Sequence, residues 1–254
     1  MEELGEEGQE RLFRSAVLVV GAGGLGSPAL LYLAAAGVGR IGVIDGDRLE
    51  VTNLNRQVIH SAAAIGRWKA ESAADTLRAF RPDLAVDVYP MMLTAENAPA
   101  LFRKYDAVVD ASDNFPTKYL CNDAAVVTGR PLVHAGVLRF GGQLLTIVPG
   151  MGPCLRCLIS EIPPRKDSPG CAEAGIVGAA AGIVGAWQAM EAITLLAGIA
   201  PRPSGSLLTI DALTGEVSRL SVARDPACPA CGNSPRISDP LPPAEYRQDP
   251  YCRA

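Results

Sequence analysis

The sequence has neither an excess of positive charge nor a secretory leader. Its 254 residues carry a formal net charge of -4 at pH 7. A net negative charge argues against a broad nucleic-acid footprint, because such a footprint needs clustered lysine and arginine. The acidic start, MEELGEEGQERLF, contains no basic segment followed by an apolar run. We therefore predict a cytoplasmic protein that does not bind nucleic acid.

A clear membrane span is also missing. The one apolar stretch long enough to cross a bilayer, residues 174–200, is interrupted by Gln188 and Glu191. A lone charge in the hydrocarbon is costly. We interpret this stretch as a central buried helix, in which Gly178 and Gly182 allow neighbouring elements to approach closely. The sequence therefore predicts no membrane partner.

Nothing in the chain resembles a flexible linker or an internal repeat. Hydrophobic residues make up 48% of the sequence and charged residues 20%, which is typical of a folded domain. We predict a single domain over residues 1–232, with a first part at about 15–149 and a second at about 150–232. Residues 233–254 are rich in proline and have almost no apolar pattern, so we expect a loosely ordered tail.

Short apolar runs alternate with helical patterns along the first part of the chain. The predicted strands are 15–21, 40–46, 85–91, 106–112, 131–137 and 142–148, and the predicted helices are 28–36, 67–80, 94–105 and 116–129. This alternation indicates an α/β fold with a Rossmann-like, mostly parallel sheet and helices on both faces. A crossing loop at 150–170, the long helix and a C-terminal strand pair at 207–224 complete the prediction.

The glycine-rich segment GAGGLG follows the first predicted strand and precedes a helix. Its glycines are Gly21, Gly23, Gly24 and Gly26. Glycines let a backbone approach phosphates, and the following helix N-terminus offers N–H groups to them. Asp45 closes the second strand, where a carboxylate can accept hydrogen bonds from ribose. This motif alone predicts a nucleotide, with NAD the usual one; a tight turn without a ligand is the alternative.

A second group of polar residues follows the strand ends on the same edge of the predicted sheet. Its members are Asn53, Asn55, Arg56, Gln57, Lys69 and Asp113. Arginine and lysine donate to phosphate oxygens, and a nearby carboxylate is suited to Mg²⁺ that bridges phosphates. The group therefore suits a triphosphate with its metal better than the pyrophosphate of NAD. No Walker sequence GxxxxGK[ST] is present, and the alternative is a solvated polar loop.

Four of the seven cysteines form two C-x-x-C pairs, Cys154 with Cys157 and Cys228 with Cys231. Four thiolates suit a closed, tetrahedral Zn²⁺ site, which would join the crossing loop to the end of the domain. A redox pair is the alternative. Cys171, at the start of the long helix, lies where a helix N-terminus favours a thiolate. It is either a reactive residue or an inert loop thiol.

These motifs occur in an order that resembles the MoeB/ThiF family. The segments that carry the resemblance are GAGGLG, NLNRQ, GRWKAES with Lys69, ASDN, CLRC, GCAEAG and CPAC. Members of this family are adenylyltransferases of ubiquitin-like sulfur-carrier proteins, related to the ubiquitin-activating enzymes. The resemblance extends from about residue 8 to residue 232.

The resemblance implies ATP-dependent adenylation of the C-terminal Gly-Gly carboxylate of a small carrier similar to MoaD or ThiS. The products would be an acyl-adenylate and pyrophosphate, made by a homodimer, and a separate sulfurtransferase or cysteine desulfurase would supply sulfur. The implied roles are ribose binding by Asp45, phosphate binding by Asn53, Arg56, Gln57 and Lys69, Mg²⁺ binding by Asp113, and zinc binding by Cys154, Cys157, Cys228 and Cys231. Cys171 matches a cysteine that links covalently to the carrier in ThiF-like members only.

Two other functions account for part of the sequence. An NAD-dependent oxidoreductase would explain GAGGLG and Asp45, but it would leave the phosphate-binding group and the zinc pairs without a use. A non-catalytic homologue that only binds carriers is the second alternative. It is favoured by a departure from the family, because the chain shows no Arg-Tyr-x-Arg-Gln stretch before the first strand. The pathway, molybdopterin or thiamine biosynthesis or another, is left open.

Overall fold

The computed structural model describes residues 1–164, 175–199, 205–239 and 241–246. Its centre is an eight-stranded sheet in the order β3-β2-β1-β4-β5-β6-β7-β8. The strands are β1 (Ala16–Val20), β2 (Arg40–Ile44), β3 (Ala85–Tyr89), β4 (Ala107–Asp110), β5 (Leu132–Leu138), β6 (Gly141–Ile147), β7 (Ser206–Asp211) and β8 (Glu216–Ser221). The first five are parallel, and the last three pair antiparallel. The predicted fold class is confirmed.

Helices cover both faces of this sheet. They are α1 (Gly5–Arg14), α2 (Gly26–Ala35), α3 (Lys69–Phe80), α4 (Ala98–Phe102), α5 (Phe115–Thr128), α6 (Leu155–Leu158) and α8 (Gly178–Ala197), with 3-10 turns at η1 (Val51–Asn53), η2 (Ala62–Ala64) and η4 (Pro243–Tyr246). Side chains of α2, α3 and α8 form one apolar core with the sheet, and those of α4 and α5 form another. Burial on both faces explains why β1 is apolar at every position.

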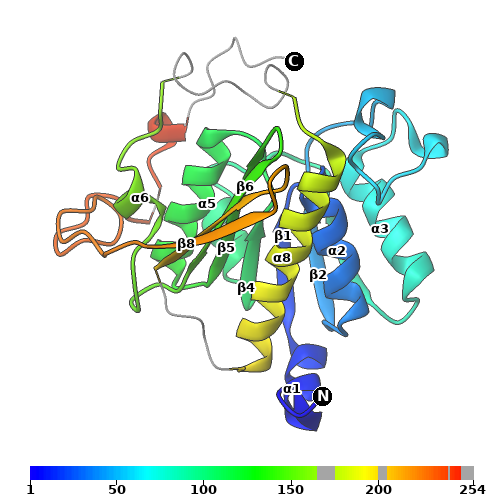
Figure 1. Ribbon diagram of the computed structural model, residues 1–254, viewed down its shortest axis with the longest axis horizontal. Helices are drawn as coiled ribbons and strands as arrows, with labels where there is room; N and C mark the ends of the chain where they lie inside the picture. The colour runs from blue at the N-terminus through cyan, green and yellow to red at the C-terminus, as the bar shows by residue number, and fades with distance from the viewer. Residues whose placement is uncertain (165–174, 200–204, 240, 247–254) are drawn as a thin grey trace.

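Helix α8 lies beside α2 across one face of the sheet (Figure 1). By length and composition it could cross a membrane. In this fold its polar residue Gln188 is fully buried and joins the helix to the sheet, because it donates to the carbonyls of Asp110 and Val133. The close approach to α2 occurs at Gly185, where a Cβ would lie 2.2 Å from the Leu25 carbonyl oxygen, and not at Gly182, where space is open.

Two segments differ from the sequence-based expectation. Helix α1 was not predicted, because its residues are mostly polar; it is held by Leu12, which is fully buried. Part of the segment after residue 232, expected to be loose, packs onto the second core through Ile237 and Leu241, each 3% exposed. Single apolar residues among prolines give no periodic signal, and sequence patterns therefore do not reveal such docking.

Candidate active site

A cavity of about 960 Å³ lies at the carboxyl ends of the parallel strands. In open α/β sheets this edge is where ligands bind. Predicted site residues that line it are Gly21, Gly23, Gly24, Asp45, Arg56, Gln57, Lys69 and Asp113. Gly26 and Asn53 are not among the lining residues. The Asn53 side chain instead accepts a hydrogen bond from the Glu50 N–H and so caps its own turn.

The glycine segment turns sharply between β1 and α2. Gly21 has φ +98°, and a Cβ there would lie 2.8 Å from the Ala111 carbonyl oxygen. A Cβ on Gly26 would lie 1.9 Å from the Gly21 carbonyl oxygen. Both positions therefore require glycine, the first for its backbone conformation and the second for space. Gly26 thus shapes the turn without lining the cavity.

The peptide groups of Ala22 are held on both sides. The N–H donates to Asp45 Oδ2 at 2.8 Å, and the carbonyl oxygen lies 2.8 Å from Nε2 of the buried His60. Nδ1 of His60 lies 2.9 Å from Ser72 Oγ on α3, one turn after Lys69. Because a carbonyl only accepts, Nε2 carries the proton and Nδ1 accepts from the serine. His60, which the sequence analysis missed, therefore connects the glycine turn to the helix that begins with Lys69.

Two buried lysines line this cavity, and their surroundings differ. Lys118 donates to the carbonyl oxygens of Ser112 and Ala135, at 2.7 and 2.5 Å, and lies 3.5 Å from Asp110 Oδ2. All three of its N–H groups are thereby directed to protein acceptors. Lys69 contacts one acceptor among the described residues, Asp47 Oδ2 at 2.9 Å, and that carboxylate is largely exposed. Lys69 consequently has donors left for a ligand, whereas Lys118 has none.

Arg56 and Gln57 also have unused polar atoms. Arg56 donates through Nη1 to the Thr52 carbonyl and to Asn55 Oδ1, and in the described structure its Nε and Nη2 have no acceptor. Gln57 is 4% exposed and lines the cavity, yet its Oε1 has no partner among the described residues. Buried polar atoms are nearly always paired in native proteins. The unpaired atoms at this edge therefore indicate a ligand that pairs with them.

Asp113 lies on a turn that a buried network fixes. The Asp110 carboxylate accepts from the backbone N–H and hydroxyl of Ser112, and from Nδ1 of His134 at 2.7 Å. Burial of Asp110 opposes its ionisation, but Lys118, His134 and Ser112 outweigh burial and lower its pKa to about 2. The turn from Asp110 to Asp113 is thus held by an ionised carboxylate, and Asp113 remains exposed at the cavity.

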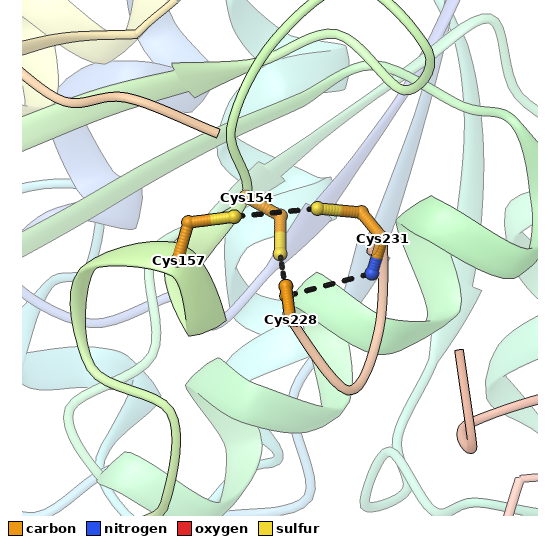
Figure 2. Close-up of side chains that lie close together, drawn as sticks. All are labelled: Cys154, Cys157, Cys228 and Cys231. Carbon is orange, nitrogen blue, oxygen red and sulfur yellow. Dashed lines mark hydrogen bonds between the residues drawn. The ribbon is translucent and has the colours of Figure 1, made fainter. Parts of the chain in front are cut away.

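The four cysteines of the C-x-x-C pairs converge away from the cavity edge. Their sulfurs lie within 4.8 Å of one another, and Figure 2 shows them pointing toward a common centre. Cys154 and Cys157 come from the start of α6, and Cys228 and Cys231 come from the loop after β8, which lies beside α6 in Figure 1. The four-cysteine cluster is consistent with Zn²⁺, which four thiolates hold in a closed site.

The four thiols are difficult to ionise together when no cation lies among them. Burial, together with neighbouring sulfurs, raises the pKa of Cys154 and raises that of Cys231 to about 12. Burial opposes ionisation of Cys228 too, but N–H donors of Cys231 and Ala230 lower its pKa. Four thiolates at these distances repel one another, so a bound divalent cation is what would allow all of them to ionise.

The segment that carries Cys154 and Cys157 is fixed to α5 by buried polar contacts. Asn122 Oδ1 accepts from the Leu155 N–H at 2.8 Å. Arg156, between the first two cysteines, is 1% exposed and donates twice to Asp123, at 2.8 Å from each oxygen. Tyr246 donates to the same carboxylate at 2.5 Å. Since α5 begins beside Asp113, one helix supports both the cysteine cluster and the cavity.

Comparison with known proteins identifies the family of this chain. The model of the ThiF family matches residues 1–230. The chain belongs to the ThiF family. It is 50% identical to the sulfur carrier protein adenylyltransferase of Thermus thermophilus over 92% of this chain and 88% of that protein. It is 46% identical to the SAMP-activating enzyme E1 of Haloferax volcanii, with 91% of this chain and 86% of that protein covered.

Longer relatives and solved structures extend the comparison. The chain is 48% identical to the adenylyltransferase and sulfurtransferase MOCS3 of Sus scrofa over 93% of this chain, and it spans about half of that protein, 52%. Crystal structures of E. coli MccB, one of them with ATP, have a TM-score of 0.79 at 22% identity and cover 89% of this chain and 69% of MccB. At that identity the likeness shows the fold alone.

One residue of the ThiF-like pattern lies outside the described structure. Cys171, predicted to be either a reactive or an inert thiol, falls within residues 165–174. Arg11 and Arg14, the arginines nearest the first strand, lie on α1 and pair with Glu7 and Glu10 on the surface. Neither is among the residues that line the cavity of this ThiF-family chain.

Proposed function

We propose that this chain adenylates the C-terminal carboxylate of a small sulfur-carrier protein with ATP, releasing pyrophosphate. The observation that carries the proposal is the set of unused donors on Arg56, Gln57 and Lys69, which share one cavity with the glycine turn. The names of the Thermus and Haloferax relatives support the same substrate class. The products would be a carrier acyl-adenylate and pyrophosphate.

The chemistry demands little acid or base catalysis from the protein. The nucleophile is a carboxylate that is already ionised, and its obstacle is repulsion from the triphosphate. Lys69 and Arg56 would offset this charge, while the N–H groups of the glycine turn would hold the phosphates. Asp45, at the end of β2, would accept from ribose. Asn53 would act from outside the cavity lining, by shaping the turn that presents Arg56.

Asp113 would hold Mg²⁺. Magnesium in nucleotide sites is commonly bound by one or two carboxylates together with phosphate oxygens, and Asp113 is exposed at the cavity with no ion-pair partner among the described residues. When bound, the ion would neutralise phosphate charge. Zn²⁺ at Cys154, Cys157, Cys228 and Cys231 would be structural. We further propose that the protein is a cytoplasmic homodimer, and that Cys171 is the position to test for a covalent link to the carrier.

The test is ATP–pyrophosphate exchange that depends on a carrier ending in Gly-Gly, with mass measurement of the adenylate. We expect Lys69→Ala and Arg56→Ala to lower the exchange rate far more than they lower ATP affinity, because both charges act as the carboxylate approaches. Lys104→Ala, an exposed lysine away from the cavity, is the matched control.

Two results would contradict the proposal in different ways. Equal losses of exchange rate and ATP affinity would remove the role of the two cations in the transition state. Tight NAD binding without exchange toward any candidate carrier would favour an oxidoreductase. A pull-down with several Gly-Gly-tailed carriers would identify which one is used.

A further inference from the structure

A ring nitrogen of His134 is left without a partner inside the cavity. His134 lies on β5, is 2% exposed and lines the cavity. Its Nδ1 lies 2.7 Å from Asp110 Oδ2, and Nε2 has no hydrogen-bond partner among the described residues. Because His134 lines the cavity, Nε2 is available to pair with a ligand there.

The surroundings of the ring determine what Nε2 can bind. The charged groups that face it are Asp110 on β4 and Lys118 on α5, which form an ion pair at 3.5 Å. The ionised Asp110 only accepts, so Nδ1 carries the proton. Burial lowers the pKa of His134, and the hydrogen bond to Asp110 only partly opposes this shift. The ring is therefore neutral near pH 7, and Nε2 is a hydrogen-bond acceptor.

An acceptor at this position is unsuited to the triphosphate, whose oxygens are acceptors too. The strand order separates the two: Asp45 lies at the end of β2, the glycine turn follows β1, Asp113 follows β4, and His134 lies on β5 beyond them. Three strand spacings of about 4.8 Å divide β2 from β5. A nucleoside bound at Asp45 therefore leaves the β5 side of the cavity to the second substrate.

The β5 side is shaped for a main chain without large side chains. Gly136, two residues after His134 on β5, lines the cavity, as does Gly141 at the start of β6, whereas the Cβ position of Gly142 is filled by Val184. A substrate tail that ends in Gly-Gly brings peptide N–H groups as donors and lacks Cβ atoms that would keep them at a distance. The acceptor at Nε2 and the space beside it therefore both suit the peptide N–H groups of a Gly-Gly tail.

We propose that Nε2 of His134 accepts a hydrogen bond from a peptide N–H of the carrier's C-terminal Gly-Gly segment and thereby sets where its carboxylate stops. Asp110 and Lys118 act through His134: the carboxylate fixes the tautomer, and the ammonium balances the buried charge. The inference rests on the proposed function, since it names a contact to the second substrate of that reaction.

A pair of variants separates the two ring nitrogens. His134→Asn keeps an N–H donor where Nδ1 was and removes the acceptor at Nε2; His134→Gln keeps an acceptor near Nε2 and loses the bond to Asp110. Steady-state exchange is measured with purified carrier and ATP varied in turn. We expect His134→Asn to raise the carrier KM about tenfold, the size of one net hydrogen bond, with the ATP KM unchanged. His134→Gln should recover part of this loss.

A second test alters the carrier and leaves the enzyme unchanged, so its result does not depend on whether the His134 variants fold. Carriers are prepared by ligation with N-methylglycine in place of each of the last two glycines in turn, which removes one N–H at a time. With the unaltered enzyme, one of the two carriers should show the same loss of about tenfold, and His134→Asn should show no further loss with it. Equal use of both methylated carriers, or a loss that adds fully to that of His134→Asn, would overturn the contact. Failure of the proposed function is distinct, because no exchange would then occur with the natural carrier.

Discussion

The middle and the start of α5 are surrounded by polar groups of opposite kinds. Near its middle, Arg156 and Asp123 are buried, and both are paired several times over with each other and with the Ser160 carbonyl and Tyr246. Around the cavity beside its start, Lys69 has one exposed partner, Gln57 Oε1 is unpaired, and His134 is bonded through Nδ1 only among the described residues. Around α5, the paired groups Arg156 and Asp123 fix the architecture, and the groups with unused polar atoms face the cavity.

The difference follows from the cost of burying a polar group. An unpaired buried donor or acceptor costs about 1–3 kcal/mol, so a fold that keeps several of them is less stable than it could be. Such groups are tolerated at sites where a ligand completes them. Substitutions near the cysteine cluster should therefore reduce stability, and substitutions at the cavity edge should reduce ATP or carrier use. The predictions below test that division, from the largest expected effect to the smallest.

Removal of the metal should cause the largest loss of stability. The cysteine cluster joins α6 to the loop after β8, and without a cation no coordinate bond links its four sulfurs. Structural zinc contributes about 10–16 kcal/mol in small peptides. The contribution here is smaller, because Asn122 and Asp123 also hold the loop, but it should exceed that of any single ion pair. A chelator should lower Tm by more than about 10 °C, with one zinc released per chain. Added Zn²⁺ should restore Tm, and an unchanged Tm would contradict the structural role.

Asp123→Asn should cause the next largest loss. Among the described residues, Arg156 then keeps only Glu245, at 3.8 Å, as a carboxylate partner, and breaking a buried ion pair costs about 3–5 kcal/mol. The free energy of unfolding is measured in urea, together with ATP affinity, which should change little. The control is Asp75→Asn, which breaks the exposed pair with Arg67 and should cost at most about 1 kcal/mol. Similar losses of unfolding free energy in the two variants would mean that the buried Arg156–Asp123 pair stabilises the fold no more than an exposed pair does.

The sequence predicted the sheet and the convergence of the cysteines because both follow from local patterns. Apolar strands buried on two faces have a simple signature, and so does a pair of C-x-x-C motifs. Arg56, Lys69 and Asp113 could be placed at one edge because parallel strands all end there. The Arg156–Asp123 pair could not be predicted, since it joins positions 33 residues apart on separate elements. His60 and Lys118 gave no signal either, because single polar residues in apolar surroundings reveal neither partner nor direction.

Asn53 shows a different limit of sequence reasoning. Its predicted phosphate contact stays a prediction: in the structure its side-chain oxygen accepts from the Glu50 N–H, and the residue is not among those that line the cavity. Asparagine commonly makes such short-range bonds to backbone groups. A motif therefore identifies the neighbourhood of a site more reliably than it identifies which atoms face the ligand.

His60 tests whether a completely paired residue behind the glycine turn can still affect ATP binding. Glutamine in its place keeps a donor near Nε2 for the Ala22 carbonyl, and asparagine keeps a group near Nδ1 for Ser72. We expect His60→Asn to weaken ATP binding about tenfold, one net hydrogen bond, and His60→Gln to weaken it less. Ser72→Ala, which removes only the link to α3, is the matched control. If both His60 variants bind ATP as tightly as the unaltered protein does, the hydrogen bond from His60 to the Ala22 carbonyl does not contribute to nucleotide binding.

Two buried glutamines provide the finest test of the division, because each has an Oε1 without a partner among the described residues. Gln57 lines the cavity and makes no side-chain hydrogen bond within the described structure, whereas Gln188 donates to the carbonyls of Asp110 and Val133. Gln57→Leu should raise the free energy of unfolding by about 1 kcal/mol and raise the ATP KM. Gln188→Leu should lower stability by about 1–3 kcal/mol, because two buried carbonyls each lose a donor. Equilibrium unfolding and ATP titration of both variants are compared under the same conditions. If Gln57→Leu also destabilises the protein, then an unpaired amide at the cavity does not indicate a ligand, and the distinction between the groups at the middle and at the start of α5 fails.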